Sequence, residues 1–215
     1  MSRLTTSATS LSLRTKVLAS VALIGTTAAI TGLGTFGTFT STTAAQTPTY
    51  TSGTVVLDYG ASGTTNRLAT GATGMAPGDT AQRGFTLRNN GTLAMASTTL
   101  TLTATTSSLL NSDATNGLTV KIDKCSVVWV ETGTTAPFTY TCAGTSTSVL
   151  ATTPLATVIA TPPVISTGLS SLTAAGVDNL VMTYTLPASA SNTVQGLSSA
   201  LNLSFTGTQR AAAAA

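Results

Sequence analysis

Short stretches of alternating apolar and polar residues follow one another along most of the chain after position 50. The clearest lie at 93–105, 179–186 and 201–205, and in the first of them Leu100 and Leu102 point the same way. Shorter ones lie at 54–59 and around Phe85 and Leu87. Such alternation predicts β-strands with one buried face. Glycine, proline, asparagine and aspartate separate these stretches, as turns between strands require.

No stretch of 12 residues in this part of the chain has helical periodicity. One or two short helical turns are expected, the best candidate lying at 107–117. The polar residues 131–136 predict a hairpin loop between strands at 118–129 and 138–142, whereas the prolines within 149–165 predict an edge strand or a broken strand there. Many short, regularly spaced strands are typical of sandwiches. We therefore predict an all-β fold, an antiparallel jelly-roll-like β-sandwich that forms a single domain over residues 51–210, with a disordered tail at 211–215.

The N-terminal region has the pattern of an export signal. Arg3, Arg14 and Lys16 precede an apolar run at 17–33, and small residues follow. Glycines and threonines interrupt the run, which makes it a poor permanent membrane anchor, because a stable span needs roughly 20 predominantly apolar residues. We predict a signal peptide over residues 1–38 and a secreted protein located in the extracellular matrix or at the cell surface.

The net charge of +3 comes entirely from that signal. After Phe39, six basic residues balance six acidic ones, and they are scattered, so a nucleic-acid partner is not expected. Charged residues make up only 7% of the chain, against about 25% in a typical soluble domain. Threonine accounts for roughly a fifth of all residues, and its β-branched side chain favours strands. A chain with almost no net charge tends to associate.

The chain has two cysteines, Cys125 and Cys142. Export places them in an oxidising compartment, where a bridge would contribute about 3 kcal/mol in the chain-entropy model. The return strand at 138–142 places Cys142 across from the strand that carries Cys125, which supports the bridge. The alternative is a pair of free buried thiols.

The chain lacks the residues that most catalytic sites require. The chain has no histidine, which excludes the Ser-His-Asp and Cys-His nucleophile systems and the His-Glu-x-x-His zinc motif. Asp79 follows a Pro-Gly turn and is expected to bond its own backbone. Asp123, between two lysines, and Asp178 are expected on the solvated surface. We predict no catalytic residue, no metal site and no cofactor.

Three blocks of the sequence resemble one family. Residues 32–39 read Gly-Leu-Gly-Thr-Phe-Gly-Thr-Phe, residues 75–79 read Met-Ala-Pro-Gly-Asp ahead of 85–93, and the C-terminal block 184–209 contains Leu186-Pro187, Gln195-Gly196 and Gln209. In this order they resemble the signal end, the Pro-Gly-Asp block and the C-terminal block of TasA- and camelysin-like proteins. Cys125, Trp129 and Cys142 resemble the disulfide-containing variant found in Gram-positive actinobacteria.

The resemblance implies a jelly-roll sandwich that a dedicated signal peptidase releases. TasA is a biofilm matrix fibre subunit whose N-terminal segment inserts as a strand into the next subunit. By this resemblance the flexible segment after the signal is the candidate donor strand, with Phe39 and Tyr50 as anchors; its residues are Phe39, Thr40, Ser41, Thr42, Thr43, Ala44, Ala45, Gln46, Thr47, Pro48, Thr49 and Tyr50. Strand addition to an open edge gains main-chain hydrogen bonds, and a head-to-tail contact that does not close gives a filament.

Two questions stay open at this level. The resemblance places the cleavage between Thr38 and Phe39, whereas the small-residue rule favours a cut after Ala45. The predicted function is a fibre subunit that binds itself and, in addition, an accessory or anchoring fibre protein. The alternatives are a monomeric surface-binding or fibre-accessory module and a secreted camelysin-like peptidase, which the lack of histidine disfavours.

Overall fold

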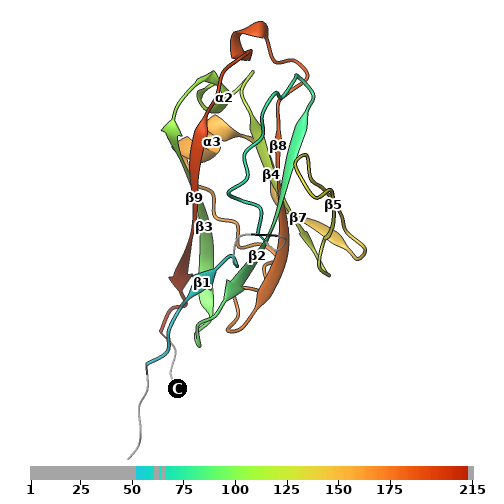
Figure 1. Cartoon of the computed structure of the whole chain (residues 1–215). Helices are drawn as coiled ribbons and strands as arrows, with labels where there is room; N and C mark the ends of the chain where they lie inside the picture. The colour runs from blue at the N-terminus through green and yellow to red at the C-terminus, as the bar shows by residue number, and fades with distance from the viewer. Residues whose placement is uncertain (1–51, 61–62, 64–65, 213–215) are drawn as a thin grey trace, which may run out of the picture. The chain divides into compact units, whose positions relative to one another are not determined.

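The larger of the two layers is a five-stranded antiparallel sheet, called sheet A. The computed structural model describes residues 52–60, 63 and 66–212. In sheet A the strands lie in the order β1-β2-β8-β4-β7 (Figure 1). Their bounds are Leu57–Asp58 for β1, Thr80–Asn89 for β2, Val177–Thr185 for β8, Thr119–Cys125 for β4 and Ser146–Pro154 for β7.

The second layer contains only two strands. Sheet B pairs β3 (Met95–Thr106) with β9 (Ala200–Gln209) in antiparallel fashion, and ten Cα pairs hold the two strands together. A separate two-stranded hairpin joins β5 (Val130–Thr132) to β6 (Thr139–Thr141). Figure 1 shows β3 and β9 side by side, facing the strands of sheet A.

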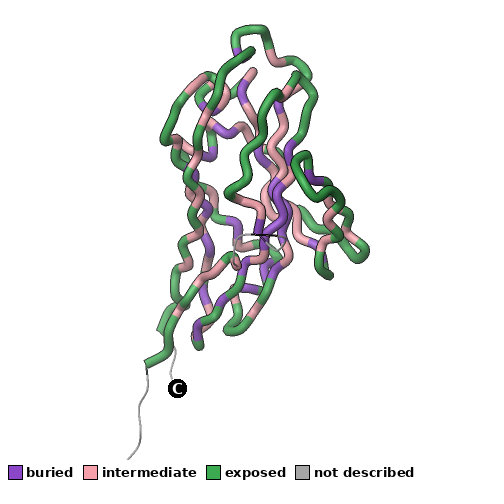
Figure 2. The backbone as a smooth tube through the Cα atoms, in the orientation of Figure 1, coloured by how far each residue is buried: buried purple, intermediate pink, exposed green. Residues whose placement is uncertain are grey.

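The inner faces of the two sheets meet in one hydrophobic core. Sheet A contributes Phe85 and Leu87 from β2, and sheet B contributes Leu100 and Leu102 from β3, all at most 3% exposed. The other fully buried side chains of this core come from β4, β8 and the segment after β7; they are Val120, Ile122, Leu180, Met182, Leu155, Val158 and Ile165. Figure 2 shows the buried positions concentrated along the strands. The chain is therefore a mostly antiparallel all-β sandwich, as its alternating pattern predicts, with only short helices; the jelly-roll connectivity stays a prediction.

The helical segments are short and lie between strands. α2 (Leu109–Ser112) begins with a capping box, in which the Ser108 side chain accepts from the backbone N–H of Leu110 and the Asn111 side chain accepts from the backbone N–H of Ser108. This helix lies within the helical turn expected at 107–117. η1 is a 3₁₀ turn at Asn192–Val194.

The helix α3 (Leu155–Ala160) was not expected from the sequence. It follows Pro154 directly, and it buries Leu155 and Val158 in the core between the sheets. Six residues with two buried positions are too few to show a helical period, and burial rather than propensity stabilises such a short helix. The edge strand expected within 149–165 is β7, which ends at Pro154.

The first predicted strand is much shorter than its pattern suggests. Alternation runs from Thr54 to Tyr59, but only Leu57 and Asp58 pair with β2. The preceding residues instead contact the turn after β2, where the backbone N–H groups of Thr92 and Leu93 both donate to the carbonyl of Thr54. The residues before Leu57 therefore bond to a tight turn and do not extend the strand pairing with β2.

The packing of this core gives a first prediction. Leu102→Ala removes a fully buried side chain from the centre of sheet B and should lower the free energy of unfolding by about 2–5 kcal/mol, because it leaves a cavity. Chemical denaturation measures the effect. The neighbouring exposed position provides the control: Thr103→Ala should change stability by less than about 0.5 kcal/mol, and equal effects at both positions would contradict the placement of the core.

Candidate functional site

The outer edge of β9 is open. Within the described part of the chain, β9 pairs with β3 and with no other strand. Eight successive pairs in regular register run from Ser97–Thr208 to Ala104–Leu201, and the register shifts at either end, between Met95 and Ser97 and between Ala104 and Thr106, fall on β3 and not on β9. A regular edge strand with unpaired N–H and C=O groups is a template for a further strand.

The core beneath β9 is incompletely covered. Leu201, Leu203 and Phe205 face the core and pack against it, yet they stay partly exposed. The β3 partners of two of them are fully buried, since Leu100 lies opposite Phe205 and Leu102 lies opposite Leu203, whereas Ala104, opposite Leu201, is partly buried. Phe205 also stacks on Phe85 of sheet A, with ring centroids 5.4 Å apart. A strand added beside β9 would complete the burial of this apolar row.

The position of β1 limits the length of the open edge. β1 contacts the C-terminal end of β9, where the Leu57 side chain lies close to Gly207. Residues 200–206 of β9 therefore remain available. A strand of seven residues spans about 23 Å, and the 12-residue candidate donor segment is long enough to cover it.

The corresponding edge of β2 is already covered. Beyond β1, Asn66 forms an isolated bridge to Phe85, and the backbone N–H of Arg67 donates to the carbonyl of Gly84 at 2.8 Å. Arg83, which is 3% exposed, donates to the carbonyls of Thr70 and Gly71 and so ties the same segment down. Burial lowers the pKa of Arg83. Among the described residues no carboxylate pairs with its guanidinium, so these carbonyls accept its hydrogen bonds instead.

The edge strand β7 carries register shifts of its own, whereas the two shifts in the β3–β9 pair fall on β3. β7 pairs with β4 through two such shifts, one between the Val120 and Ile122 pairs and one between the Ile122 and Asp123 pairs. β-Bulges bend a strand, and proteins use them with proline to protect exposed edges. β7 has both features, because it ends at Pro154. Of the two exposed edges, β9 is thus the one suited to accept a strand.

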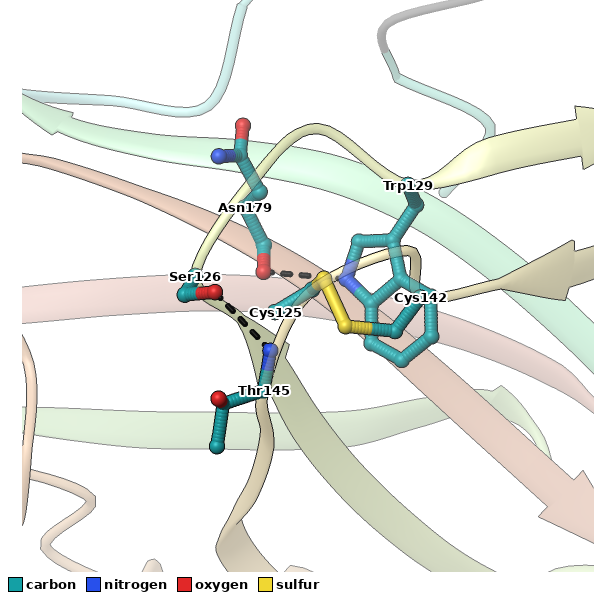
Figure 3. The surroundings of a disulfide bond; sticks show 6 residues. All are labelled: Cys125, Ser126, Trp129, Cys142, Thr145 and Asn179. Atoms are coloured by element: carbon teal, nitrogen blue, oxygen red, sulfur yellow. Dashed lines mark hydrogen bonds between the residues drawn. A yellow bond between two sulfur atoms is a disulfide. The ribbon is translucent and has the colours of Figure 1, made fainter.

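A disulfide holds the β5–β6 hairpin to sheet A. Cys125 at the end of β4 bonds to Cys142 just after β6, with the Cα atoms 5.7 Å apart. Figure 3 shows Trp129 beside this bond, where its indole N–H donates to the carbonyl of Asn179 on β8 at 3.0 Å. The bridge considered for Cys125 and Cys142 is therefore present, and the alternative of two free thiols is excluded.

A charged cluster fastens the same hairpin to the covered edge of β2. Arg67 binds Glu131 through two hydrogen bonds of 2.6 and 3.1 Å, and the Tyr140 hydroxyl donates to Glu131 at 2.7 Å. The hydrogen bonds from Arg67 lower the pKa of Glu131, and its carboxylate raises the pKa of Arg67 in turn. The Arg67 guanidinium also lies 4.4 Å from the centroid of the Phe138 ring. No sequence motif signals this cluster, because its members are far apart along the chain.

Asp178 and Lys124 form an ion pair at one end of the sandwich, which corrects the expectation that Asp178 lies on the solvated surface. The Asp178 side chain is 0% exposed and 2.6 Å from the Lys124 amine. Burial by itself raises the pKa of Asp178, but the hydrogen bonds from Lys124 and from the backbone N–H groups of Ser171 and Ser170 outweigh it and hold the pKa below its ordinary value. Proximity of β4 to β8 brings the pair together.

The other carboxylates behave more simply. Asp123 forms an ion pair with Lys121 at 2.8 Å on the surface. Asp79 bonds its own turn, as expected, because its side chain accepts from the backbone N–H of Ala76 at 2.7 Å. Asp79 also lines a hollow of about 330 Å³ together with Arg83, Thr73 and Pro137. The residues that line this hollow include no nucleophile paired with a base.

The family comparison gives a clear result. The sequence profile of the family described as "Camelysin metallo-endopeptidase" matches residues 12–214. The chain belongs to this family. A search of curated proteins finds no match. The resemblance to TasA- and camelysin-like proteins that the three sequence blocks indicate is thereby confirmed.

The family description implies a metal, and the residues of this camelysin-family chain do not fit one. The sequence has no histidine, and both cysteines are consumed by the disulfide. Across residues 52–60, 63 and 66–212, no three side chains of the His, Cys, Asp or Glu type gather to hold an ion. In that same part of the chain no helix is long and apolar enough to cross a membrane.

The predicted donor strand Phe39–Tyr50, the signal peptide at 1–38 and its cleavage after Thr38 or Ala45 lie outside the described residues. They stay predictions. The open edge of β9, to which the donor hypothesis assigns a partner, is a feature that sequence analysis missed. The only signal for it is the alternation of Leu201, Leu203 and Phe205 near the C-terminus, which identifies a strand but not its neighbours.

Removing the disulfide tests its role as a clamp. Cys125→Ser with Cys142→Ser should lower the free energy of unfolding by about 3 kcal/mol, because the loop between the cysteines is no longer closed in the unfolded chain. Thermal melting of the oxidised protein, of the variant and of the reduced protein measures this loss. Equal melting temperatures for all three would show that the noncovalent contacts of the hairpin suffice.

The ion pair of Asp178 and Lys124 predicts an acid-sensitive end of the sandwich. Because folding lowers the pKa of Asp178, the stabilisation is present above the unfolded-state pKa of about 3.9 and is lost as the pH falls through the lower folded value. Asp178→Asn should remove this part of the pH dependence while also lowering stability at neutral pH, since Lys124 loses its partner. Denaturation series between pH 2 and pH 7 measure both. Asp123→Asn, which removes the less buried ion pair with Lys121, is the control, and a wild-type slope in Asp178→Asn would contradict the assignment.

Proposed function

We propose that this camelysin-family protein is a secreted structural subunit that polymerises head to tail. The single observation that supports the proposal is the open, regular edge of β9 above an incompletely covered apolar row. The segment Phe39–Tyr50 of one copy is the proposed strand that adds to residues 200–206 of the next. This contact does not close on itself, so repeated addition produces a filament.

The donor segment matches the edge in character. It has no charged residue and carries aromatic residues at its two ends, Phe39 and Tyr50. β9 has no charged residue either, so strand addition meets no repulsion between side chains. Main-chain hydrogen bonds supply affinity, and the partly exposed Leu201, Leu203 and Phe205 offer apolar contacts to alternate donor side chains.

The proposal includes the route of the protein to its site of assembly. The family match begins at residue 12, within the predicted signal, and the disulfide suits an oxidising compartment. Release by a dedicated signal peptidase frees the donor strand only after export, so that polymerisation is delayed until the chain is outside the cell. A related anchoring or accessory fibre protein is the second proposed partner.

The peptidase named by the family is the second candidate function, and the family description alone favours it. Among the described residues, no three metal-ligating side chains gather to hold the zinc ion that such a peptidase needs. The hollow beside Asp79 lacks a nucleophile–base pair. We therefore propose no catalytic role. Proteolysis of a casein substrate by the purified mature protein, blocked by a chelator, would restore the peptidase.

Deletion of residues 39–50 tests the donor strand. The mature protein should form filaments visible by electron microscopy, and the deleted protein should remain monomeric in sedimentation, because the open edge of β9 then has no strand to accept. Filaments that persist after the deletion would show that the segment is not the donor.

A synthetic peptide with the sequence 39–50 locates the acceptor. Added to the deleted protein, it should slow amide hydrogen exchange at alternate residues within 200–206, since only the N–H groups that point away from β3 gain partners, and it should leave β7 unchanged. It should also stop filament growth of the intact protein. A scrambled peptide of the same composition is the control, and protection of β7 instead of β9 would assign the acceptor to the other edge.

A further inference from the structure

A hollow of about 330 Å³ lies where the segment 71–75, the start of β2 and the loop between β5 and β6 meet, and both Asp79 and Arg83 line it. The backbone N–H of Leu186 donates to the carbonyl of Asp79, which continues the pairing of β2 with β8 by one residue. Asp79, Ala81 and Arg83 therefore lie on one side of the strand, and the Cα atoms of Asp79 and Arg83 are about 13 Å apart. The hollow thus has one charged residue toward each end.

Arg83 is a buried cation without a counter-charge. It is 3% exposed. All six aspartate and glutamate residues of the chain lie in the part that the structure describes, and none of them pairs with it. Its Nε, Nη1 and Nη2 atoms donate to the carbonyls of Thr70, Gln82 and Gly71, respectively. A guanidinium has five N–H groups, so one on each terminal nitrogen has no partner among the described residues. The carbonyls orient the guanidinium but do not neutralise its charge.

The surroundings of Arg83 have an excess of one positive charge. The Arg67 and Arg83 guanidinium groups lie 4.4 and 5.7 Å from the centroid of the Phe138 ring. The carboxylate of this cluster, Glu131, is already bound by Arg67 through two hydrogen bonds and by the Tyr140 hydroxyl. Burial of an unpaired charge is costly, and burial is the main cause that lowers the pKa of Arg83. An anionic group in the hollow would balance this charge.

The other end of the hollow carries the opposite charge. Asp79 is exposed, and its Oδ2 atom accepts from the backbone N–H of Ala76 at 2.7 Å, which leaves Oδ1 free to accept from a ligand. Between the two ends the lining is small and apolar, with Ala81 and Pro137 as part of it. A simple anion would be repelled by Asp79, whereas a molecule with a carboxylate at Arg83 and an amine at Asp79 meets complementary charge at both ends.

We propose that this hollow binds a small zwitterion, with its carboxylate on the two free N–H groups of Arg83 and its amine on Asp79. The spacing of the two residues favours a molecule whose charges are several ångström apart, which free lysine and the two ends of a short peptide both provide. The volume lies at the lower end of small-ligand pockets, which span roughly 300–1,000 Å³. The hollow shares no residue with the proposed acceptor edge at 200–206, so the inference does not depend on polymerisation.

Equilibrium dialysis of the secreted protein against labelled 6-aminohexanoate tests the site, and it works alike for single subunits and for filaments. The probe should bind once per chain. Hexanoate, which lacks the amine, and hexylamine, which lacks the carboxylate, should each compete about tenfold more weakly, because each leaves the charge at one end unpaired. Lysine and glycylglycine should both displace the probe, and the stronger of the two identifies the source of the ligand as a free amino acid or a peptide.

Three variants locate the binding. Arg83→Met should weaken binding of the probe about tenfold or more, because its carboxylate loses a charged donor; Arg88→Met, which changes an exposed arginine of the same strand, is the matched control and should leave binding unchanged. Gly71→Leu blocks the hollow and leaves Arg83 in place, since a Cβ at Gly71 would meet no atom within 4 Å, and it carries the test if Arg83→Met does not fold. Asp79→Asn should reverse the preference, so that hexanoate binds at least as tightly as 6-aminohexanoate.

Equal binding of hexanoate and 6-aminohexanoate by the wild type would overturn the proposal, as would a probe affinity that neither Arg83→Met nor Gly71→Leu lowers. Displacement of the probe by glucuronate more strongly than by lysine or glycylglycine would assign the hollow to acidic sugars and not to zwitterions. If the wild type binds none of 6-aminohexanoate, lysine and glycylglycine, the site is excluded. None of these results bears on filament formation, which electron microscopy measures separately.

Discussion

The inequality of the two layers governs this structure. Sheet A has five strands and sheet B has two, yet both must cover one apolar core. A two-stranded layer cannot shield the inner face of a five-stranded one, so other segments close the sides. Residues 63 and 66–71 cover the edge of β2, α3 fills the space after β7, and the segment 163–165 bridges to β3 through its backbone. Beside β9 no described segment does so.

That imbalance explains the position of the polar ties. Arg67 with Glu131, Arg83 with the carbonyls of Thr70 and Gly71, and the disulfide all fasten covering segments to sheet A. A loop laid over a strand edge has few apolar contacts to hold it, so directional bonds and a covalent bridge replace them. The outcome is a sandwich in which the edge of β2 and the free side of β3 are covered, whereas the edge of β9 is open over residues 200–206.

Threonine makes such an open structure compatible with water. On β3 and β9 the inner positions are apolar apart from the buried Thr98, whereas the outer positions from 97 to 103 and from 202 to 208 are hydroxyl or amide residues. These hydroxyls keep the outer face hydrated without charge, and the β-branched side chains favour the strand conformation. The absence of charge has a consequence, because charged side chains are the usual protection against edge-to-edge association. In a protein whose proposed role is assembly, that protection would be a disadvantage.

Alternation along the chain was enough to identify β2, β3, β4, β8 and β9 and the side of each that is buried, because a period of two residues is a local property of the backbone. It also placed the turn of Asp79 and brought Cys142 back to Cys125. It overestimated β1 and missed α3, where contacts with distant residues outweigh local preference. The burial of Asp178 and its pairing with Lys124 depend on which strands are neighbours in the sheet, and so does the open edge of β9. Local sequence therefore determined which residues form strands and which face inward, while only the tertiary structure decided the order of the strands, because pairing partners are chosen by the shared core and not by the strands themselves.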